Sequence, residues 1–408
     1  MSLSKIYNLN KNNLLFSSNS IIKKYREDIL SKFSESYFNK KNNESIKNFD
    51  LTLIDALRYN YEKSLLSDSV KINNSNYFDI RVFNGNCENF SNDKIQINFL
   101  DDKEEKSLFD AKDLSYNDLI LDLNSLFTNS GFELIIKKNV KVIINIENIV
   151  SDQALTLFQK NLIKCEEGSE LTLIENYKEN SSFFHNVVSN FKLDKNAKLN
   201  HLIIQNNNLN KNLFVTTKSN LAQSSELKQS SFNFSKGFVR NHHYANLFEF
   251  NSSANFKGVF FLNGYNCADN KTFVTHKSES CKSDQSYKGV LTEKSKATYY
   301  SNTIVEKEAQ KTEGYQLSKG ILLSDDATFF SKPELRIYAD DVKCSHGSTI
   351  GPINDDLIYY IRSRGLTKIE ATKILIHSFV QDDILEIKDE DIKFQVLSHL
   401  DNYLNRIN

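Results

Sequence analysis

Short segments of similar composition recur through the middle of the chain, each with an apolar residue, a few polar turn residues, one small residue and an apolar strand-like run. The small residues lie 28 or 29 residues apart at first; a gap of 43 residues follows, and the last interval is 30 residues. They are Gly168, Ala197, Ser225, Ala254, Ala297 and Ala327. Such a period is typical of solenoids and repeat arrays, whose units must stack because none buries its own apolar face. The repeat therefore favours a β-solenoid over a sandwich, with an insertion or irregular coil between Ala254 and Ala297.

Alternating apolar residues fill the chain from residue 77 to about residue 350. The pattern begins with YFDIRVFNG and KIQINFL, and after Gly131 almost every apolar run is short and alternating. Such alternation is typical of half-buried strands, and no helical spacing interrupts it between about residues 160 and 350. We therefore predict a mainly β fold whose core, over residues 131–352, is a β-helix (solenoid).

Helical spacing of apolar residues appears towards the N-terminus. It runs through Ile21–Phe33 and Leu51–Leu66, and a shorter helical piece is expected at Leu119–Phe127. Two alternating segments lie between these stretches. Residues 1–130 should therefore form a mostly helical domain with a few strands.

Helical signals return after residue 352. They are Asn354 as N-cap and Gly365 as the residue after the end of a helix over 355–364, a Thr367/Glu370 capping box for a second helix, and a third helix over roughly 390–407. The predicted apolar positions are Leu357, Ile358, Tyr360 and Ile361 in the first helix, Ile369, Ile374, Leu375 and Phe379 in the second, and Ile392, Val396, Leu400, Leu404 and Ile407 in the third. Residues 353–408 should therefore form a C-terminal helical domain.

The charge balance and hydropathy exclude two kinds of partner. With 51 basic and 52 acidic residues, the 408-residue chain lacks the excess of Lys and Arg that a broad nucleic-acid or membrane surface needs. No window approaches ~18 apolar residues, and the N-terminus has no apolar run followed by a cleavage site. The sequence predicts no nucleic-acid partner, no membrane span, and a cytoplasmic location, or a stromal one for a plastid protein.

Motifs of known enzymes are missing from the sequence. It contains no G-x-x-x-x-G-K-[ST], G-x-G-x-x-G, G-x-S-x-G or H-E-x-x-H. A carbohydrate-active β-helix enzyme is the alternative, but such enzymes need paired carboxylates, and the adjacent Asp340 and Asp341 would face opposite sides of a strand. Five scattered cysteines, never in C-x-x-C, also disfavour a zinc protein or a disulfide framework. We predict no catalytic residues and no enzyme activity.

Cys344 and His346 are the candidate metal-ligating residues. On a strand, residues two apart point to the same face. Thiolate and imidazole both bind iron or zinc, although two ligands alone hold a metal weakly and need others from elsewhere. The alternative is a buried cysteine and a hydrogen-bonded histidine at a strand end. Arg362 and Arg364, near a predicted helix end, are either part of an interface or cations favoured there by the helix dipole.

The other histidines and cysteines are weaker candidates. His242 and His243 are adjacent, so on a strand they cannot chelate together. Cys267, His276 and Cys281 could cluster only if the intervening chain folded back. The remainder are expected to be surface or packing residues: His185, His201, His377, His399, Cys87 and Cys165.

Three stretches of the sequence resemble the SufB/SufD family of iron–sulfur cluster assembly scaffold proteins. KPELRIYADDVKCSHGSTIGPINDDLIYYIRSRG resembles that family's C-terminal signature, while NKTFVTHKSESCKSDQSYKG and LDLNSLFTNSGFELIIKKNV are similar to its middle and to its entry into the β core. The resemblance spans about residues 75–385. The Cys-Ser-His-Gly step resembles the SufD branch, since the SufB branch typically has His-Glu-Ala there. The N-terminal region departs from the family, whose Pro- and Trp-containing segment is missing because the chain has no Trp.

The resemblance implies a right-handed parallel β-helix between helical N- and C-terminal domains, and a complex with SufB and the ATPase SufC. Such a scaffold has no turnover of its own: SufC hydrolyses ATP, and the scaffold pair holds a transient iron–sulfur cluster. His346 would be the metal ligand at the SufB interface, with Cys344 as a second ligand or a support for the ring, and SufC would contact the C-terminal helices. Whether the chain forms a homodimer when alone, and whether a flavin binds the complex, stays open.

Overall fold

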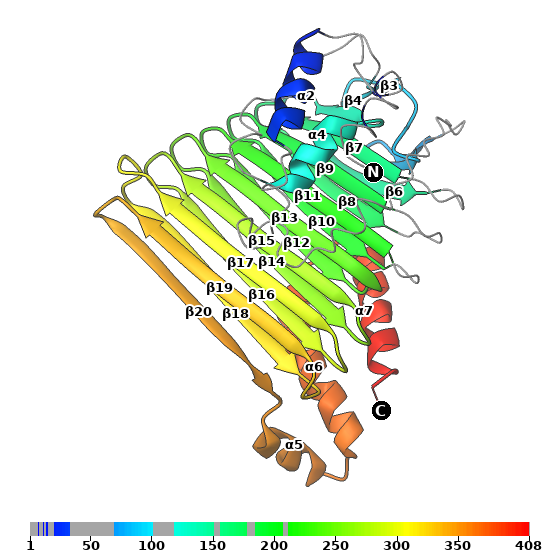
Figure 1. Ribbon diagram of the computed structural model, residues 1–408, viewed down its shortest axis with the longest axis vertical. Coiled ribbons are helices and arrows are strands. Elements are labelled where there is room, and N and C mark those ends of the chain that lie inside the picture. The colour runs from blue at the N-terminus through cyan, green and yellow to red at the C-terminus, as the bar shows by residue number, and fades with distance from the viewer. Residues whose placement is uncertain are drawn as a thin grey trace.

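The computed structural model of the chain describes residues 7, 11, 14, 20–32, 69–100, 118–150, 156–177, 184–206 and 211–407. Strands make up most of this part of the chain and form a parallel β-solenoid, with helices from both ends of the chain packed on it (Figure 1). This confirms the mainly β solenoid that the repeat predicted and the terminal helices that the helical spacing predicted. The right-handed sense of coiling stays a prediction, and the predicted helix at Leu51–Leu66 lies outside the described residues.

Two ten-stranded sheets form the walls of the solenoid, and strands from β5 onward alternate between them. Sheet A contains, in spatial order, β1 (Val70–Asn74), β2 (Tyr77–Phe83), β6 (Lys141–Ile149), β8 (Glu170–Tyr177), β10 (Lys198–Gln205), β12 (Glu226–Asn233), β14 (Ser253–Leu262), β16 (Lys282–Leu291), β18 (Thr312–Leu322) and β20 (Val342–Pro352). Sheet B contains β3 (Phe90–Ser91), β4 (Ile95–Phe99), β5 (Phe132–Ile136), β7 (Thr156–Cys165), β9 (Phe184–Leu193), β11 (Lys211–Leu221), β13 (Gly237–Leu247), β15 (Cys267–His276), β17 (Lys296–Val305) and β19 (Thr328–Ile337).

The sequence repeat is the length of one solenoid turn. Lys198 pairs with Glu226, 28 residues later, in sheet A. At the corner before each of these strands the backbone closes a tight turn: the N–H of Ala197 donates to the carbonyl of Asp194 over 3.0 Å. The residue before it, Asn196, has a φ of 58°. A small residue fits this corner because the next turn stacks directly on it.

The predicted insertion between Ala254 and Ala297 is wrong. Ala254 lies on β14 in sheet A, whereas Ala297 lies on β17 in sheet B, so the 43-residue gap is one and a half regular turns. Register continues through it without a break, since Ser253 pairs with Lys282 and Cys267 with Lys296. The small residues up to Ala254 therefore lie at sheet A, those from Ala297 onward lie at sheet B, and the solenoid turns between them are regular.

Apolar side chains of both sheets fill most of the solenoid interior, but a buried polar strip runs beside them. His201 Nε2 and Glu175 Oε2 are 2.6 Å apart, and both side chains are almost fully buried. Thr217 Oγ1 and His243 Nδ1 are 2.9 Å apart, and His276 Nε2 lies 2.8 Å from Ser283 Oγ. Burial lowers the pKa of His243, and it lowers the pKa of His276 to about 4.

The buried His276 predicts a loss of stability at mildly acidic pH. The unfolded chain protonates this histidine near pH 6.5, whereas the folded chain does so only near pH 4, so the unfolded state binds more protons between those values. At 1.36 kcal/mol per pH unit, unfolding free energy should fall by up to about 3 kcal/mol as pH drops through this window. Urea midpoints at several pH values measure it. His276→Gln should flatten the dependence, and an unchanged slope in the variant would refute this assignment.

The terminal helices cover the outer faces of the two sheets. α2 (Ser20–Lys32) and α4 (Leu119–Phe127) pack over sheet B, while α6 (Lys368–Leu385) and α7 (Glu390–Leu404) pack over sheet A. The Tyr403 hydroxyl donates across this second interface to the carbonyls of Leu262 and Val290, at 3.1 and 3.2 Å. None of the described helices combines the length and the apolar character that a membrane crossing needs.

The N-terminal capping signals of the C-terminal helices are confirmed, but part of the predicted apolar stripe is wrong. Asn354 caps α5 (Asp355–Arg362), and Thr367 and Glu370 form the capping box of α6. The side chains that α6 buries include Ala371, Ile376, Val380 and Ile384, whereas Ile369 and Ile374 are exposed. α5 buries Ile358 alone. Only the side of each helix that packs on the solenoid is buried. When apolar residues occur on every side of a helix, its sequence does not show which side that will be.

The strands before residue 131 belong to the solenoid walls. β2 pairs in parallel with β6 in sheet A, and β4 pairs antiparallel with β5 in sheet B. The predicted boundary between residues 130 and 131 therefore does not fall at an edge of either sheet. At the other end, β20 finishes at Pro352 and α5 starts at Asp355.

A buried ion pair attaches α4 to sheet B. Asp118, the N-cap of α4, accepts from the backbone N–H of Ile120 over 2.9 Å, and its other carboxylate oxygen contacts the Arg240 guanidinium and the Tyr244 hydroxyl. His242 lies between this carboxylate and that of Asp269. Asp118 and Arg240 are both about 1% exposed, and the positive charge of Arg240 holds the pKa of Asp118 below its usual range against the opposing effect of burial.

Candidate functional site

The C-terminal end of the solenoid presents two strand edges. β20 is the last strand of sheet A and pairs with β18, and β19 is the last strand of sheet B and pairs with β17 (Figure 1). In the described part of the chain, nothing extends either sheet beyond them. Unpaired backbone N–H and C=O groups along such edges can bind a further strand.

Cys344 and His346 lie on β20, two residues apart, as predicted. Cys344 points into the solenoid, because a Cβ added to its register partner Gly314 would lie 3.3 Å from the Cys344 sulfur. The thiol is half-buried, and this burial raises its pKa. His346 pairs in register with Gln316 and is exposed. The strand therefore directs both side chains to its inner face, at the open end of the solenoid.

This pair is not a complete metal centre in the chain by itself. Among the described residues, no group of three or more His, Cys, Asp or Glu side chains could hold a metal ion. Asp340 and Asp341 lie in the bend before β20 and not on the strand, so the argument from opposite strand faces does not apply to them. A cluster bound at His346 and Cys344 would need ligands from outside this part of the chain.

The other candidate ligands do not assemble. His242 and His243 point to opposite faces of β13, as predicted, with His242 against Asp269 and His243 inside the solenoid. Cys281 contacts Ser252 Oγ at a corner, and it forms no metal-binding group with Cys267 and His276. The thiols of Cys87 and Cys165 are buried, which raises the pKa of each to about 12. Such thiols remain protonated and poorly reactive at neutral pH.

Arg362 and Arg364 are exposed at the end of α5. The Arg364 guanidinium donates to the Tyr360 hydroxyl over 2.6 Å and lies 4.9 Å from the centre of that ring. Three large side chains of α5 are also exposed to solvent: Leu357, Tyr359 and Tyr360 are 49, 75 and 58% exposed. α5 therefore presents an aromatic and basic surface away from the solenoid.

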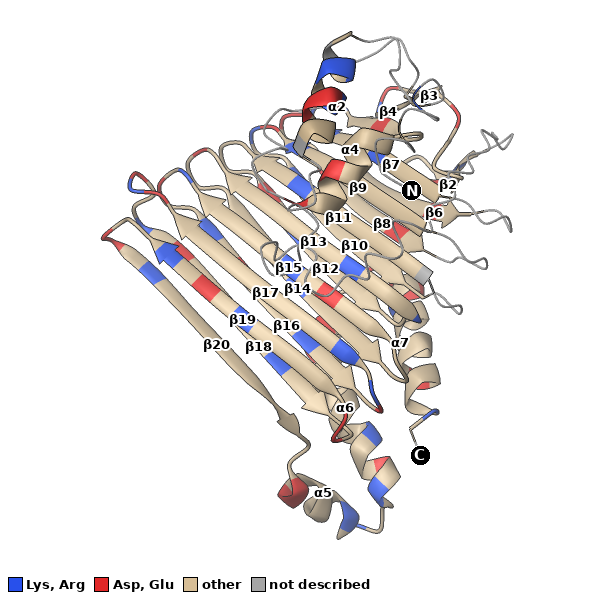
Figure 2. Ribbon diagram, viewed as in Figure 1, with Lys and Arg blue, Asp and Glu red and all other residues tan. Residues whose placement is uncertain are grey.

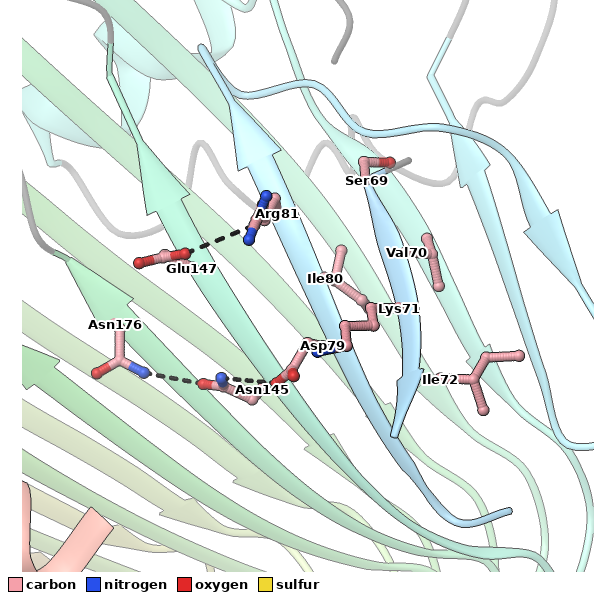
Figure 3. Close-up of a pocket in the computed structure, with 10 residues that line it drawn as sticks. All are labelled: Ser69, Val70, Lys71, Ile72, Asp79, Ile80, Arg81, Asn145, Glu147 and Asn176. Atoms are coloured by element: carbon pink, nitrogen blue, oxygen red, sulfur yellow. Dashed lines mark hydrogen bonds and ion pairs between the residues drawn. The ribbon is translucent and has the colours of Figure 1, made fainter. Parts of the chain in front are cut away.

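A pocket of about 590 Å³ lies at the opposite end of sheet A, between the β1–β2 hairpin and β8 (Figure 3). Its polar groups bind each other in a row: Asn145 donates to Asp79, and Asn176 donates to Asn145, each over 2.9 Å. Its other carboxylate, Glu147, faces Arg81 at 3.9 Å. Both carboxylates of the pocket thus have partners, and this arrangement gives no support to an acid–base pair of the glycosidase kind.

Basic and acidic residues are interspersed along the ribbon in Figure 2, including β19 and the turns at the strand ends. That distribution agrees with the balanced composition of 51 basic and 52 acidic residues. A nucleic-acid surface would need a stripe or patch of one sign.

The sequence did not reveal the groups behind His346. Gln316 is the register partner of His346 on β18, and Gln285 is the register partner of Gln316 on β16. The amide nitrogens of Gln316 and Gln285 both donate to Thr303 Oγ1, over 2.8 and 2.6 Å. Each lies about 30 residues before the next in the chain. The repeat period, applied backwards from His346, is the one signal that could have found them.

Comparisons with known proteins match the solenoid to one family. The family described as "SUF system FeS cluster assembly, SufBD core domain" matches residues 148–379, more than half of the chain. The iron–sulfur cluster assembly protein SufD of Escherichia coli is 28% identical over 256 residues, covering 62% of this chain and 60% of that protein. SufD of Bacillus subtilis is 24% identical over 286 residues, covering 68 and 64%.

A plant relative extends the comparison. The chloroplastic protein ABCI7 of Arabidopsis thaliana is 28% identical over 248 residues, which cover 59% of this chain and 51% of that protein. The chain thus spans between half and two thirds of the length of these relatives. With the family match running through the solenoid and into α6, the chain belongs to the SufBD family of the SUF iron–sulfur cluster assembly system.

Proposed function

We propose that the chain is a non-catalytic scaffold subunit that builds and transfers nascent iron–sulfur clusters together with a SufB-type scaffold and a SufC-type ATPase. One observation carries this proposal: Cys344 and His346, whose side-chain types can bind iron, lie on β20 at the open end of the solenoid, where the edges of β19 and β20 are unpaired in the described part of the chain. A partner docked on those edges would bring the missing ligands to the same place. The cluster is cargo on this account, and the chain holds no permanent cofactor.

The open end has the composition of an interface that another protein covers. Large apolar side chains stand exposed on the last strands and the turn between them, among them Phe330 at 59% and Tyr338 at 65%. Exposed apolar side chains next to unpaired strand edges favour docking of a further strand. A SufB-type chain with a similar solenoid would fit these edges. A second copy of this chain could pair there when the partner is absent.

Amide hydrogen exchange tests where the partner docks. In a complex with a SufB-type protein, amides of β19 and β20 should exchange at least about tenfold more slowly than in the free chain, because edge N–H groups become hydrogen-bonded. Amides of α7 on the outer face of sheet A serve as the internal control. A stable complex in which β19 and β20 exchange as in the free chain would rule out this docking site.

The exposed surface of α5 is our candidate ATPase contact. Truncation after Gly351 is a poor test, because it would also uncover the apolar face of sheet A that α6 and α7 bury. Tyr359→Glu changes a 75% exposed side chain instead. Aromatic side chains at the centre of an interface typically contribute about 2 kcal/mol of binding free energy. Loss of the Tyr359 ring should therefore lower the affinity for the ATPase ~30-fold. Tyr265→Glu, at a turn residue that is 79% exposed, should leave ATPase affinity unchanged. Equal affinity in both variants and wild type would exclude α5.

The remaining expectations follow from the scaffold proposal. ATP hydrolysis would belong to the SufC-type partner, and the location would be cytoplasmic or stromal, where such a complex assembles. Whether a flavin binds the complex stays open. The alternative, a carbohydrate-active β-helix enzyme, would require the carboxylates of the pocket near Asp79 to be free, and they are engaged with Asn145 and Arg81.

A further inference from the structure

Three polar residues form a column on the inner face of sheet A that ends at the open edge. Gln285 on β16 pairs with Gln316 on β18, which pairs with His346 on β20. Neighbouring strands are about 4.8 Å apart, so Gln316 lies directly behind the imidazole on the buried side. Gln316 is 3% exposed, whereas His346 is exposed.

The contacts of Gln316 fix the orientation of its amide. The amide nitrogen donates to Thr303 Oγ1 over 2.8 Å and to the backbone carbonyl of Glu334 over 3.2 Å. A carbonyl oxygen only accepts hydrogen bonds, so the atom that faces Glu334 must be the nitrogen. The amide oxygen then points elsewhere, and it is buried with no hydrogen-bond partner among the described residues.

An unpaired buried acceptor costs about 1–3 kcal/mol, so a donor brought next to it gains a favourable hydrogen bond. The imidazole of His346 is the neighbouring side chain in register, and it makes no hydrogen bond to another described residue. A partner that closes the open end would remove water from this ring. A histidine that donates one N–H to a fixed oxygen keeps the lone pair of its other nitrogen for a metal.

We propose that Gln316 is a positioning residue for His346: its amide oxygen accepts the imidazole N–H in the assembled complex and directs the other ring nitrogen towards the iron. The iron part of this inference rests on the proposed scaffold function. The orientation of the Gln316 amide does not depend on that proposed function, because its contacts to Thr303 and Glu334 lie within the chain itself.

The test measures iron affinity by chelator competition in complexes co-expressed with SufB- and SufC-type partners. Gln316→Leu removes the acceptor and should weaken iron binding 10–100-fold, the usual effect of losing the partner of a ligating histidine. Gln316→Glu keeps an acceptor oxygen but loses both donor contacts, and it should bind iron within about threefold of wild type. Gln285→Leu is the matched control, since it removes the other donor to Thr303 one strand further from His346.

The Glu variant separates positioning from packing. If Gln316 acts only by donating to Thr303 and Glu334, Gln316→Glu should be as weak as Gln316→Leu or weaker, and the proposal falls. Wild-type affinity in Gln316→Leu would also overturn it. Gln316→Met replaces Gln316→Leu if the leucine variant melts at a lower temperature than wild type. His346→Ala is measured alongside: if it keeps wild-type affinity, the scaffold site itself is wrong, whereas loss in His346→Ala with retention in Gln316→Leu refutes the positioning role alone.

Discussion

Replacing His346 with alanine should leave the three-component complex assembled but reduce its iron and sulfide to less than about a tenth of wild type. Removal of a ligand should cost at least as much as removal of a ligand's hydrogen-bond partner, which is typically 10–100-fold in affinity. The strand should tolerate the change, because the His346 side chain is exposed and makes no hydrogen bond with the described residues. Iron and sulfide analysis of the purified complex measures the effect.

His377→Ala is the matched control for this experiment. His377 is also a partly exposed histidine, on α6, with its ring 3.1 Å from Asp401, and it lies away from β20. Its complex should carry wild-type iron. If His346→Ala complexes carry wild-type iron and sulfide and mature a client protein normally, then His346 has a structural role and the cluster is held elsewhere.

Replacing Asp118 with alanine should destabilise the fold by about 3–5 kcal/mol, the usual cost of leaving one member of a buried ion pair without its partner. The variant would leave the Arg240 guanidinium, which is 1% exposed, with only the more distant carboxylate of Asp269 at 3.8 Å, and it would also remove the N-cap of α4. Asp118→Asn retains capping capacity and separates the two effects, since a cap contributes ~1 kcal/mol. Denaturant midpoints at pH 7 give the measurement.

An exposed ion pair supplies the comparison for Asp118. Asp401 and His377 form a pair whose side chains are 61 and 41% exposed, so Asp401→Ala should change stability by less than about 1 kcal/mol. Equal losses for Asp118→Ala and Asp401→Ala would show that the buried charge network around Arg240 does not stabilise the attachment of α4 to sheet B.

The features that could be predicted from the sequence are those set by local or strictly periodic rules. The 28-residue register between Lys198 and Glu226 follows from stacking equal turns, so the interval between small residues revealed the solenoid. The capping box of Thr367 and Glu370 is encoded within four residues, and it formed as predicted. Once β20 is a strand, the shared face of Cys344 and His346 follows from the two-residue period of its side chains.

The features that could not be predicted depend on contacts between distant parts of the chain. Asp118 meets Arg240 across 122 residues, and no local pattern joins them. The prediction that Ile369 and Ile374 belong to the buried face of α6 was wrong, because apolar residues occur around the whole helix. Packing against sheet A determines which of them are buried. The open edge beside His346 is visible only when it is known that β20 ends sheet A.

The central claim is that this chain works as one part of a cluster-building assembly, and co-expression tests it most directly. The chain is produced together with a SufB-type scaffold and a SufC-type ATPase, purified through a tag on this chain alone, and analysed by size-exclusion chromatography with iron and sulfide determination. We expect one species that contains all three proteins and carries iron and sulfide. Elution of this chain without the other two, or a three-protein species free of iron and sulfide under reducing, anaerobic conditions, would contradict the claim.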